Sequence, residues 1–261
     1  MRVIDLDEAN KGIFSMCLED WSADARVGAP RRARWVERSL PKGLRAKLAV
    51  DDDGRVGGMI QYLPIEHSCV DGEGLHVILC TWIHGHPQGR GNFQGRGMGS
   101  ALLEAAEADA VRRGAKGMVA WGIWLPFWMR AKWYRNRGYL KADRQGLAVL
   151  VWKPFKADAR PPRWYPRRKE APATVPGKVT VTSLTSGWCL AGNLTCEGAR
   201  SAAAEFGDRV VFREIDTSER PAVAYWGRSD ALFVDASEVR IGPPPTFEKI
   251  RDVIASRVRR L

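Results

Sequence analysis

A glycine-rich segment in the first half of the chain has the spacing of a phosphate-binding turn. Gln94-Gly95-Arg96-Gly97-Met98-Gly99 lies between an apolar run of strand length and a sequence with helical periodicity. Glycines here allow a tight turn that points several backbone N–H groups at one spot, and the following helix adds the positive end of its dipole. The segment therefore predicts a cradle for a pyrophosphate.

Side chains that could accept a proton lie upstream of this turn. His84 ends the apolar run, where its side chain can point into a cleft, and an imidazole titrates in the useful range. Glu66, His67 and His86 are further candidates. The sequence does not choose among them, and a base that acts through water chains is equally compatible with it.

The elements that must position these residues form one mixed α/β layer over the first half of the chain. Hydrophobic spacing predicts helices over 8–20, 29–40, 99–113 and 126–137 and strands over 47–50, 56–63, 75–83, 116–124 and 147–152. Leu75–Ile83 is apolar almost throughout, as in a strand buried on both faces. Such an order of elements is typical of helices packed on a mixed sheet.

The second half of the chain predicts a smaller α/β sheet. Strands are expected over 179–184 and 210–215, a hairpin over 231–241, and helices over 189–206 and 247–258, with an extra helical turn near Val223. Six prolines and several basic residues between Lys153 and Lys178 indicate a semi-rigid linker. The predicted division is therefore 1–157, a linker over 158–177, and 178–261.

The first half resembles the GNAT superfamily of N-acetyltransferases. The Q-x-x-G-x-G pattern of the glycine turn is similar to that family's acetyl-CoA signature, and Ala131-Lys132-Trp133-Tyr134-Arg135-Asn136-Arg137-Gly138-Tyr139 resembles its later helix. The resemblance implies acetyl transfer from acetyl-CoA to a small-molecule or peptide amine by direct attack in a ternary complex. It also implies cofactor contacts from Ile83, His84, Gln94, Gly95, Arg96, Gly97, Met98, Gly99, Ser100 and Tyr134.

The same resemblance implies roles in the chemistry. Tyr134 matches the family's general acid, whose hydroxyl protonates the leaving thiolate, and His84 or Glu66 would act as the base. The dense tryptophans Trp121, Trp124, Trp128 and Trp133 are interpreted mainly as core, with some walling an acceptor pocket for an apolar or cationic amine.

The second half resembles the YoaP-like, thioredoxin-like domains found behind GNAT domains. The resemblance rests on Ser186-Gly187-Trp188-Cys189, on FREIDT from Phe212 and on GPPPTFEKI from Gly242. A helix begins after Cys189, which can lower a thiol pKa. Cys196 lies seven residues on, about 10 Å away in one helix, too far for a disulfide. An adaptor or substrate-contacting role is therefore expected for the domain, and Cys189 as a possible reactive thiol is the alternative.

Composition narrows the remaining classes. The five cysteines have no CxxC pair, which argues against a disulfide framework and a zinc site, so no metal is expected. With no apolar stretch of membrane-spanning length, a cytoplasmic protein without membrane contact is expected. The net charge of +11 is scattered apart from the linker, so nucleic acid is not the expected partner. Two alternatives stay open: a weakly catalytic CoA-binding module that touches nucleic acid through the linker, and thiol chemistry at Cys189.

Overall fold

The chain divides into two compact units. The computed structural model describes residues 1–125, 129–239 and 244–261. Unit 1 comprises Met1–Ser22 and Val36–Tyr165, and unit 2 comprises Ala23–Trp35 and Pro166–Leu261. The sequence pattern does not predict that residues 23–35 group with the second half of the chain, more than a hundred residues away.

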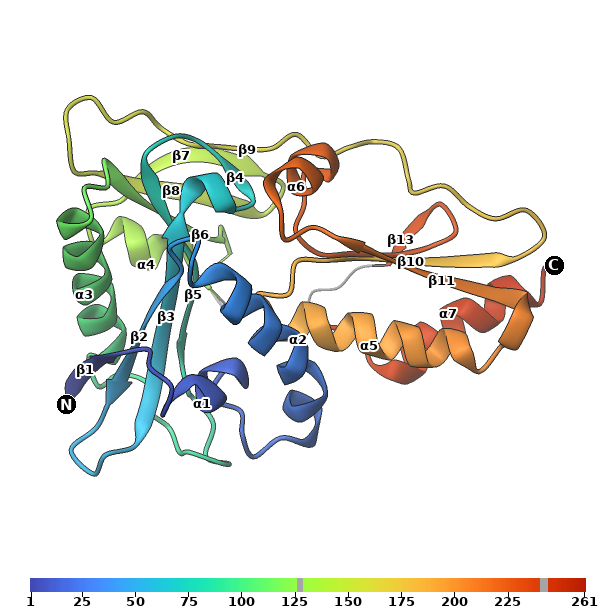
Figure 1. Cartoon of the computed structure of the whole chain (residues 1–261), viewed down its shortest axis with the longest axis horizontal. Helices are drawn as coiled ribbons and strands as arrows, with labels where there is room; N and C mark the ends of the chain where they lie inside the picture. Colours follow the sequence, from blue (N-terminus) through green and yellow to red (C-terminus); the bar gives the residue numbers. More distant parts are fainter. Residues whose placement is uncertain (126–128, 240–243) are drawn as a thin grey trace. The chain divides into compact units, whose positions relative to one another are not determined.

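Within the described residues, unit 1 is built on a seven-stranded sheet in the order β1-β2-β3-β5-β6-β8-β7 (Figure 1). All neighbouring strands are antiparallel except β5 and β6, which are parallel. The strands are β1 (Arg2–Asp5), β2 (Arg45–Val50), β3 (Val56–Pro64), β5 (Leu75–Ile83), β6 (Gly117–Ile123), β8 (Ala148–Pro154) and β7 (Leu140–Gln145). This mixed sheet confirms the expected α/β class.

The helices of unit 1 pack on both faces of this sheet. In Figure 1, α3 (Met98–Arg112) and α4 (Ala131–Arg135) lie on one face and α1 (Lys11–Ser15) on the other. The predicted stripe of α3 is buried, since Leu102, Leu103, Ala106 and Ala110 all lie in the core. A 3₁₀ turn, η1 (Ile65–His67), and a small ladder of β4 (Val70–Asp71) with β9 (Arg163–Trp164) complete the unit.

Several boundaries differ from the prediction for identifiable reasons. The first helix is only five residues long, because Asp7 and Asn10 exchange side-chain to backbone hydrogen bonds of 3.0 Å before it and Cys17 and Leu18 leave the helical region after it. Helix α2 spans Ala23–Ser39 and continues through Pro30. The polar strands β1 and β7 were not predicted. Of the predicted helix 126–137, residues 126–128 lie outside the described residues, as do residues 240 and 241 of the predicted hairpin.

Unit 2 holds a four-stranded sheet in the order β11-β10-β12-β13 within the described residues. Strands β10 (Val179–Thr185) and β11 (Val210–Asp216) are parallel, whereas β12 (Ala231–Val234) and β13 (Ser237–Val239) run antiparallel to their neighbours. Helices α5 (Leu190–Ala204) and α7 (Phe247–Val258) pack on one face through an apolar cluster. The turn expected near Val223 is a helix, α6 (Arg220–Trp226).

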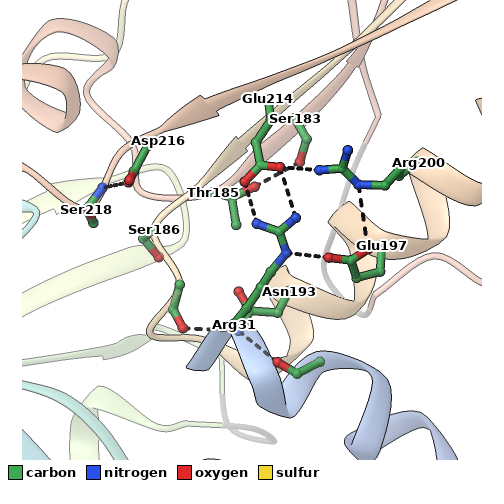
Figure 2. A network of polar contacts seen from close by, with 12 residues as sticks. Arg31, Ser183, Thr185, Ser186, Asn193, Glu197, Arg200, Glu214, Asp216 and Ser218 are labelled. Carbon is green, nitrogen blue, oxygen red and sulfur yellow. Dashed lines mark hydrogen bonds and ion pairs between the residues drawn. The ribbon is translucent and has the colours of Figure 1, made fainter. Parts of the chain in front are cut away.

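The first part of α2 is tied into unit 2 by charged groups. Figure 2 shows Arg31 between Glu197 of α5 and Glu214 of β11. Its Nε donates to Glu197 at 2.5 Å, its Nη2 donates to Glu214 at 2.9 Å, and Arg200 also pairs with Glu214. The neighbouring Arg32, which is almost fully buried, donates to the carbonyl of Trp188. Residues 23–35 are therefore a structural part of unit 2.

Candidate active site

The site begins where two parallel strands stop pairing. Strands β5 and β6 pair only from Leu75 to Val77, and beyond that point β6 continues to pair with β8 alone. A register shift opposite Gln61 and Tyr62 marks the same level of β5. In the described part of the chain, no strand pairs with this edge of β5 after Val77. A cavity of about 610 Å³ opens here between Thr81–Ile83 and Trp121.

Backbone amides line one end of this cavity. Gly95 and Gly97 have φ of +76° and +81°, and a Cβ at either position would meet no atom within 4 Å. Gly97 is the N-cap of α3, whose first backbone hydrogen bond runs from Ala101 to Gly97. The N–H groups from Gly95 to Ser100 have no hydrogen-bond partner among the described residues. They are free to bind an anion at the positive end of the helix.

Arg137 adds a full positive charge to this end. Its Nη2 donates to Ser100 Oγ at 2.8 Å, and its guanidinium lies 4.0 Å from the centre of the Trp133 ring. Both partners belong to the cavity wall. The sequence motif contains Arg137, but its role was not predicted, because only the fold brings this end of α4 beside the first turn of α3.

Tyr134 stands deeper in the same cavity. Its hydroxyl lies 3.1 Å from Thr81 Oγ1, and its ring packs between Trp133 and Tyr139. Burial raises the pKa of Tyr134 well above its ordinary value, so the hydroxyl keeps its proton at any ordinary pH. A neutral phenol at this place is a proton donor toward the cavity.

His84 lies outside the cavity wall, which differs from its predicted role. The side chain is fully buried, its Nδ1 is 2.8 Å from the carbonyl oxygen of Gly91, and its Nε2 is 3.7 Å from Glu19. A bidentate pair of Arg90 with Asp20, at 2.9 Å for both bonds, holds the same loop. These contacts show His84 fixing the segment 84–93 in place.

Glu66 is also remote from the cavity. It sits in η1, next to the beginning of β5, and accepts a hydrogen bond of 2.8 Å from the amide of Gly74. The cavity lies at the far end of β5, at Thr81–Ile83. The length of that strand therefore separates Glu66 from Tyr134.

The remaining predicted contacts fall into two groups. Those that line the cavity are Ile83, Gln94, Gly95, Gly97, Met98, Gly99, Ser100 and Tyr134. Arg96 is exposed and lies over the ring of Phe93, 5.2 Å from its centre. Phe93 is buried against Gly57, where a Cβ would come within 2.4 Å of the ring. Phe93 thus anchors the glycine turn to β3, a role that the sequence pattern does not show.

The other end of the cavity is aromatic. Trp82, Trp121, Met129 and Arg130 line it. Trp121 Nε1 donates to the carbonyl of Leu79 at 2.9 Å, so this ring spans the gap between β6 and β5. Of the tryptophans interpreted as core or pocket wall, Trp121 and Trp133 line the cavity, Trp124 is more than half exposed, and Trp128 lies outside the described residues.

In unit 2, the two cysteines of α5 differ in environment. Cys189 is the N-cap of α5 and partly exposed, whereas Cys196 is buried, which raises the pKa of its thiol. Near the same end of α5, Ser186 donates to Asp230 through its amide at 3.1 Å and through its hydroxyl. Burial raises the pKa of Asp230 to about 6.

Two kinds of feature are absent from the described residues. No group of three or more His, Cys, Asp and Glu side chains is arranged to hold a metal ion. No described helix is long and apolar enough to cross a membrane.

Comparison with protein families gives one match. Residues 14–139 match the model of the acetyltransferase (GNAT) family. The match covers just under half of the chain and includes the glycine turn, Tyr134 and most of the cavity wall. It confirms the resemblance of the N-terminal part to this family. It does not reach 178–261, so the thioredoxin-like identity of that region stays a prediction.

No curated protein matches the sequence of this chain. Similar solved structures include a GNAT family N-acetyltransferase (YhbS) from Escherichia coli in complex with CoA. Its sequence is 16% identical, the alignment covers 60% of this chain and 82% of that chain, and the TM-score is 0.43. A GNAT family acetyltransferase from Brucella melitensis in complex with acetyl-CoA has 16% identity, coverage of 61% and 90%, and a TM-score of 0.41. The ribosomal-protein-alanine N-acetyltransferase from Brucella melitensis has 17% identity, coverage of 59% and 100%, and a TM-score of 0.45.

Proposed function

We propose that unit 1 transfers an acetyl group from acetyl-CoA to the nitrogen of an amine, with both substrates bound at once. One observation carries this proposal: unpaired backbone amides and a buried, protonated tyrosine line the same cavity, where β5 and β6 part. The family match over residues 14–139 supports it.

The residues at the amide end fit acetyl-CoA. The pyrophosphate would accept hydrogen bonds from the N–H groups of Gly95 to Ser100, and Arg137 would balance its charge. The open spaces above Gly95 and Gly97 leave room for an anion to approach the backbone. Past Val77, β5 has no described strand partner on this side, and apart from the Leu79 carbonyl, which Trp121 binds, its backbone groups up to Ile83 would be offered to the amides of the pantetheine arm.

Tyr134 would then act on the sulfur. The amine nitrogen attacks the thioester carbonyl carbon, the C–N bond forms and the C–S bond breaks. The sulfur takes up a proton from the Tyr134 hydroxyl, and the nitrogen loses one, so the proton count balances once Tyr134 is reprotonated. Thr81, 3.1 Å from that hydroxyl, would hold it in place.

The proton leaves the amine without help from His84 or Glu66. Neither His84 nor Glu66 lines the cavity, and both are bound to backbone groups elsewhere. We therefore propose that this proton passes to water. The expected consequence is that turnover rises with pH as the fraction of uncharged amine rises.

The proposal is tested with the full chain. Calorimetry should show binding of acetyl-CoA, and a thiol-specific reagent should show CoA release that depends on an added amine, with the acetylated product identified by mass spectrometry. Binding of acetyl-CoA without CoA release from any amine would leave a CoA-binding module, the alternative that the sequence leaves open. No binding would refute the assignment.

We also propose that unit 2 is a thioredoxin-like domain. The strand order β11-β10-β12-β13, in which β10 pairs in parallel with the edge strand β11 and antiparallel with β12, and the packing of α5 and α7 on one face support this reading. The partly exposed position of Cys189 at the start of α5 keeps thiol chemistry as the second candidate function of this unit. The alternative is an adaptor that helps to recognise the acceptor.

A further inference from the structure

The cavity wall includes side chains from both faces of the sheet. Ile83 points to the face of α3, since it lies beside Gly58 and Gly99, and Thr81 reaches Tyr134 of α4 on that same face. Alternate residues of a strand point to opposite faces. Trp82 therefore points the other way, where its ring lies 6.2 Å from that of His86. Arg130, the N-cap of α4, belongs to the same wall.

The charge of the cavity is entirely positive. Among the described residues that line it, Arg130 and Arg137 are the charged side chains, and none is acidic. Arg137 is bound to Ser100 at the amide end. Arg130, in contrast, is exposed and forms no side-chain hydrogen bond or ion pair with any described residue.

A second residue of the cavity wall, Trp82, also carries a donor without a described partner. Its Nε1 is buried, and within the described chain nothing accepts its hydrogen bond. Of the two residues, Arg130 is the exposed one, so its guanidinium is the donor that a ligand oxygen with negative charge can reach.

Two acidic residues on the loop after α1 are already engaged with basic side chains. On the loop after α1, Asp20 pairs with Arg90, and Glu19 faces His84. Neither lines the cavity. A polycationic acceptor, such as a polyamine or an aminoglycoside, would therefore meet Arg130 and no carboxylate, and the like charges would repel.

We propose that the acceptor is a small, apolar or aromatic α-amino acid, whose amine is acetylated while Arg130 binds its carboxylate. This inference rests on the proposed function and names its substrate class. Trp82, Trp121 and Met129 supply the apolar surface for the side chain of the acceptor. Arg130 is a specificity residue, because the guanidinium binds a carboxylate with two parallel hydrogen bonds.

Binding of reaction products tests this without requiring turnover. With CoA present, calorimetry on the full chain would compare the N-acetyl derivatives of phenylalanine, methionine and tryptophan with their carboxamides, which lack the charge. We expect at least one carboxylate to bind tenfold or more tightly than its amide. Arg130→Gln should abolish that preference. Arg135→Gln, which removes an exposed charge from the same helix outside the cavity, should retain it.

Turnover separates this inference from the proposed function. CoA release would be measured with the three amino acids, their amides, spermidine and kanamycin. Preference for the free amino acids supports both. Acetylation of spermidine or kanamycin in preference to amino acids overturns the inference and leaves the proposed function standing. Equal binding of acids and amides, binding of none of the acids, or a preference that survives Arg130→Gln also overturns it.

Discussion

Replacing Gly97 by aspartate tests the anion cradle most directly. A Cβ at this position would meet no protein atom, so the substitution creates no clash within the chain. The backbone conformation, with φ of +81°, costs a non-glycine residue about 1–2 kcal/mol. The new carboxylate would stand at the start of α3, where we place the pyrophosphate of acetyl-CoA.

The loss of affinity follows from charge. Two unit negative charges about 6 Å from the carboxylate, at the dielectric constant of water, each cost about 0.7 kcal/mol. Together they amount to about 1.4 kcal/mol, which is a tenfold rise in Kd. Weaker screening beside the protein makes tenfold a lower limit.

Gly114 provides the matched control. It follows the other end of α3, has φ of +82°, and also has open space around its Cβ position. Both variants carry the strain of a positive φ, and because a carboxylate stabilises a helix start and destabilises a helix end, Gly114→Asp should lose at least as much stability as Gly97→Asp on thermal unfolding. Calorimetry should show that only Gly97→Asp loses affinity for acetyl-CoA. A folded Gly97→Asp with unchanged Kd, or equal losses in the two variants, would refute the cradle.

Three further predictions concern other residues. Tyr134→Phe should lower turnover about a hundredfold, while the Kd of acetyl-CoA stays within about twofold. The control Tyr139→Phe, outside the cavity wall, should keep its turnover. Wild-type turnover in Tyr134→Phe, with chemistry rate-limiting, would make Tyr134 a packing residue. Burial raises the pKa of Asp230 from 3.8 to about 6, so the folded state holds its proton more tightly. The free energy of unfolding should therefore fall as the pH rises from about 4 to 6, by at most about 3 kcal/mol. Denaturant unfolding should show this fall in the wild type and not in Asp230→Asn, and the same pH dependence in both proteins would contradict the assignment. Cys189 should be alkylated before Cys196 at neutral pH, since Cys189 is partly exposed and Cys196 is buried. If peptide mass spectrometry finds Cys196 modified first, the result would contradict a thiol-based role for Cys189.

The sequence predicted the parts of the site that depend on local pattern. The glycine turn, the strand before it and the helix after it are contiguous in the chain, and turn chemistry and apolar spacing are visible there. The core strands β3, β5 and β6 are apolar enough to be predicted. By contrast, β1 and β7 are short or polar, and only pairing with a neighbour makes them strands.

What the sequence could not show depends on contacts between distant segments. His84 was predicted as a base from its place at the end of β5, whereas its contacts with the carbonyl of Gly91 and the carboxylate of Glu19 arise only from the fold. Arg130 and Trp82 gain significance only because the chain folds back over Gly122, where Met129 and Ala131 come within 2.6 Å of a Cβ position. No periodicity marks such a crossing.

The composition of unit 2 also constrains how this protein is made. Residues 23–35 leave the ribosome about 130 residues before the rest of their unit begins, a delay of roughly 6 to 26 s at typical elongation rates. Throughout that time Arg31 and Arg32 lack the carboxylates and the carbonyl that later bind them. Unit 2 can therefore be completed only after the synthesis of unit 1, and its folding must wait for the last strands of the chain.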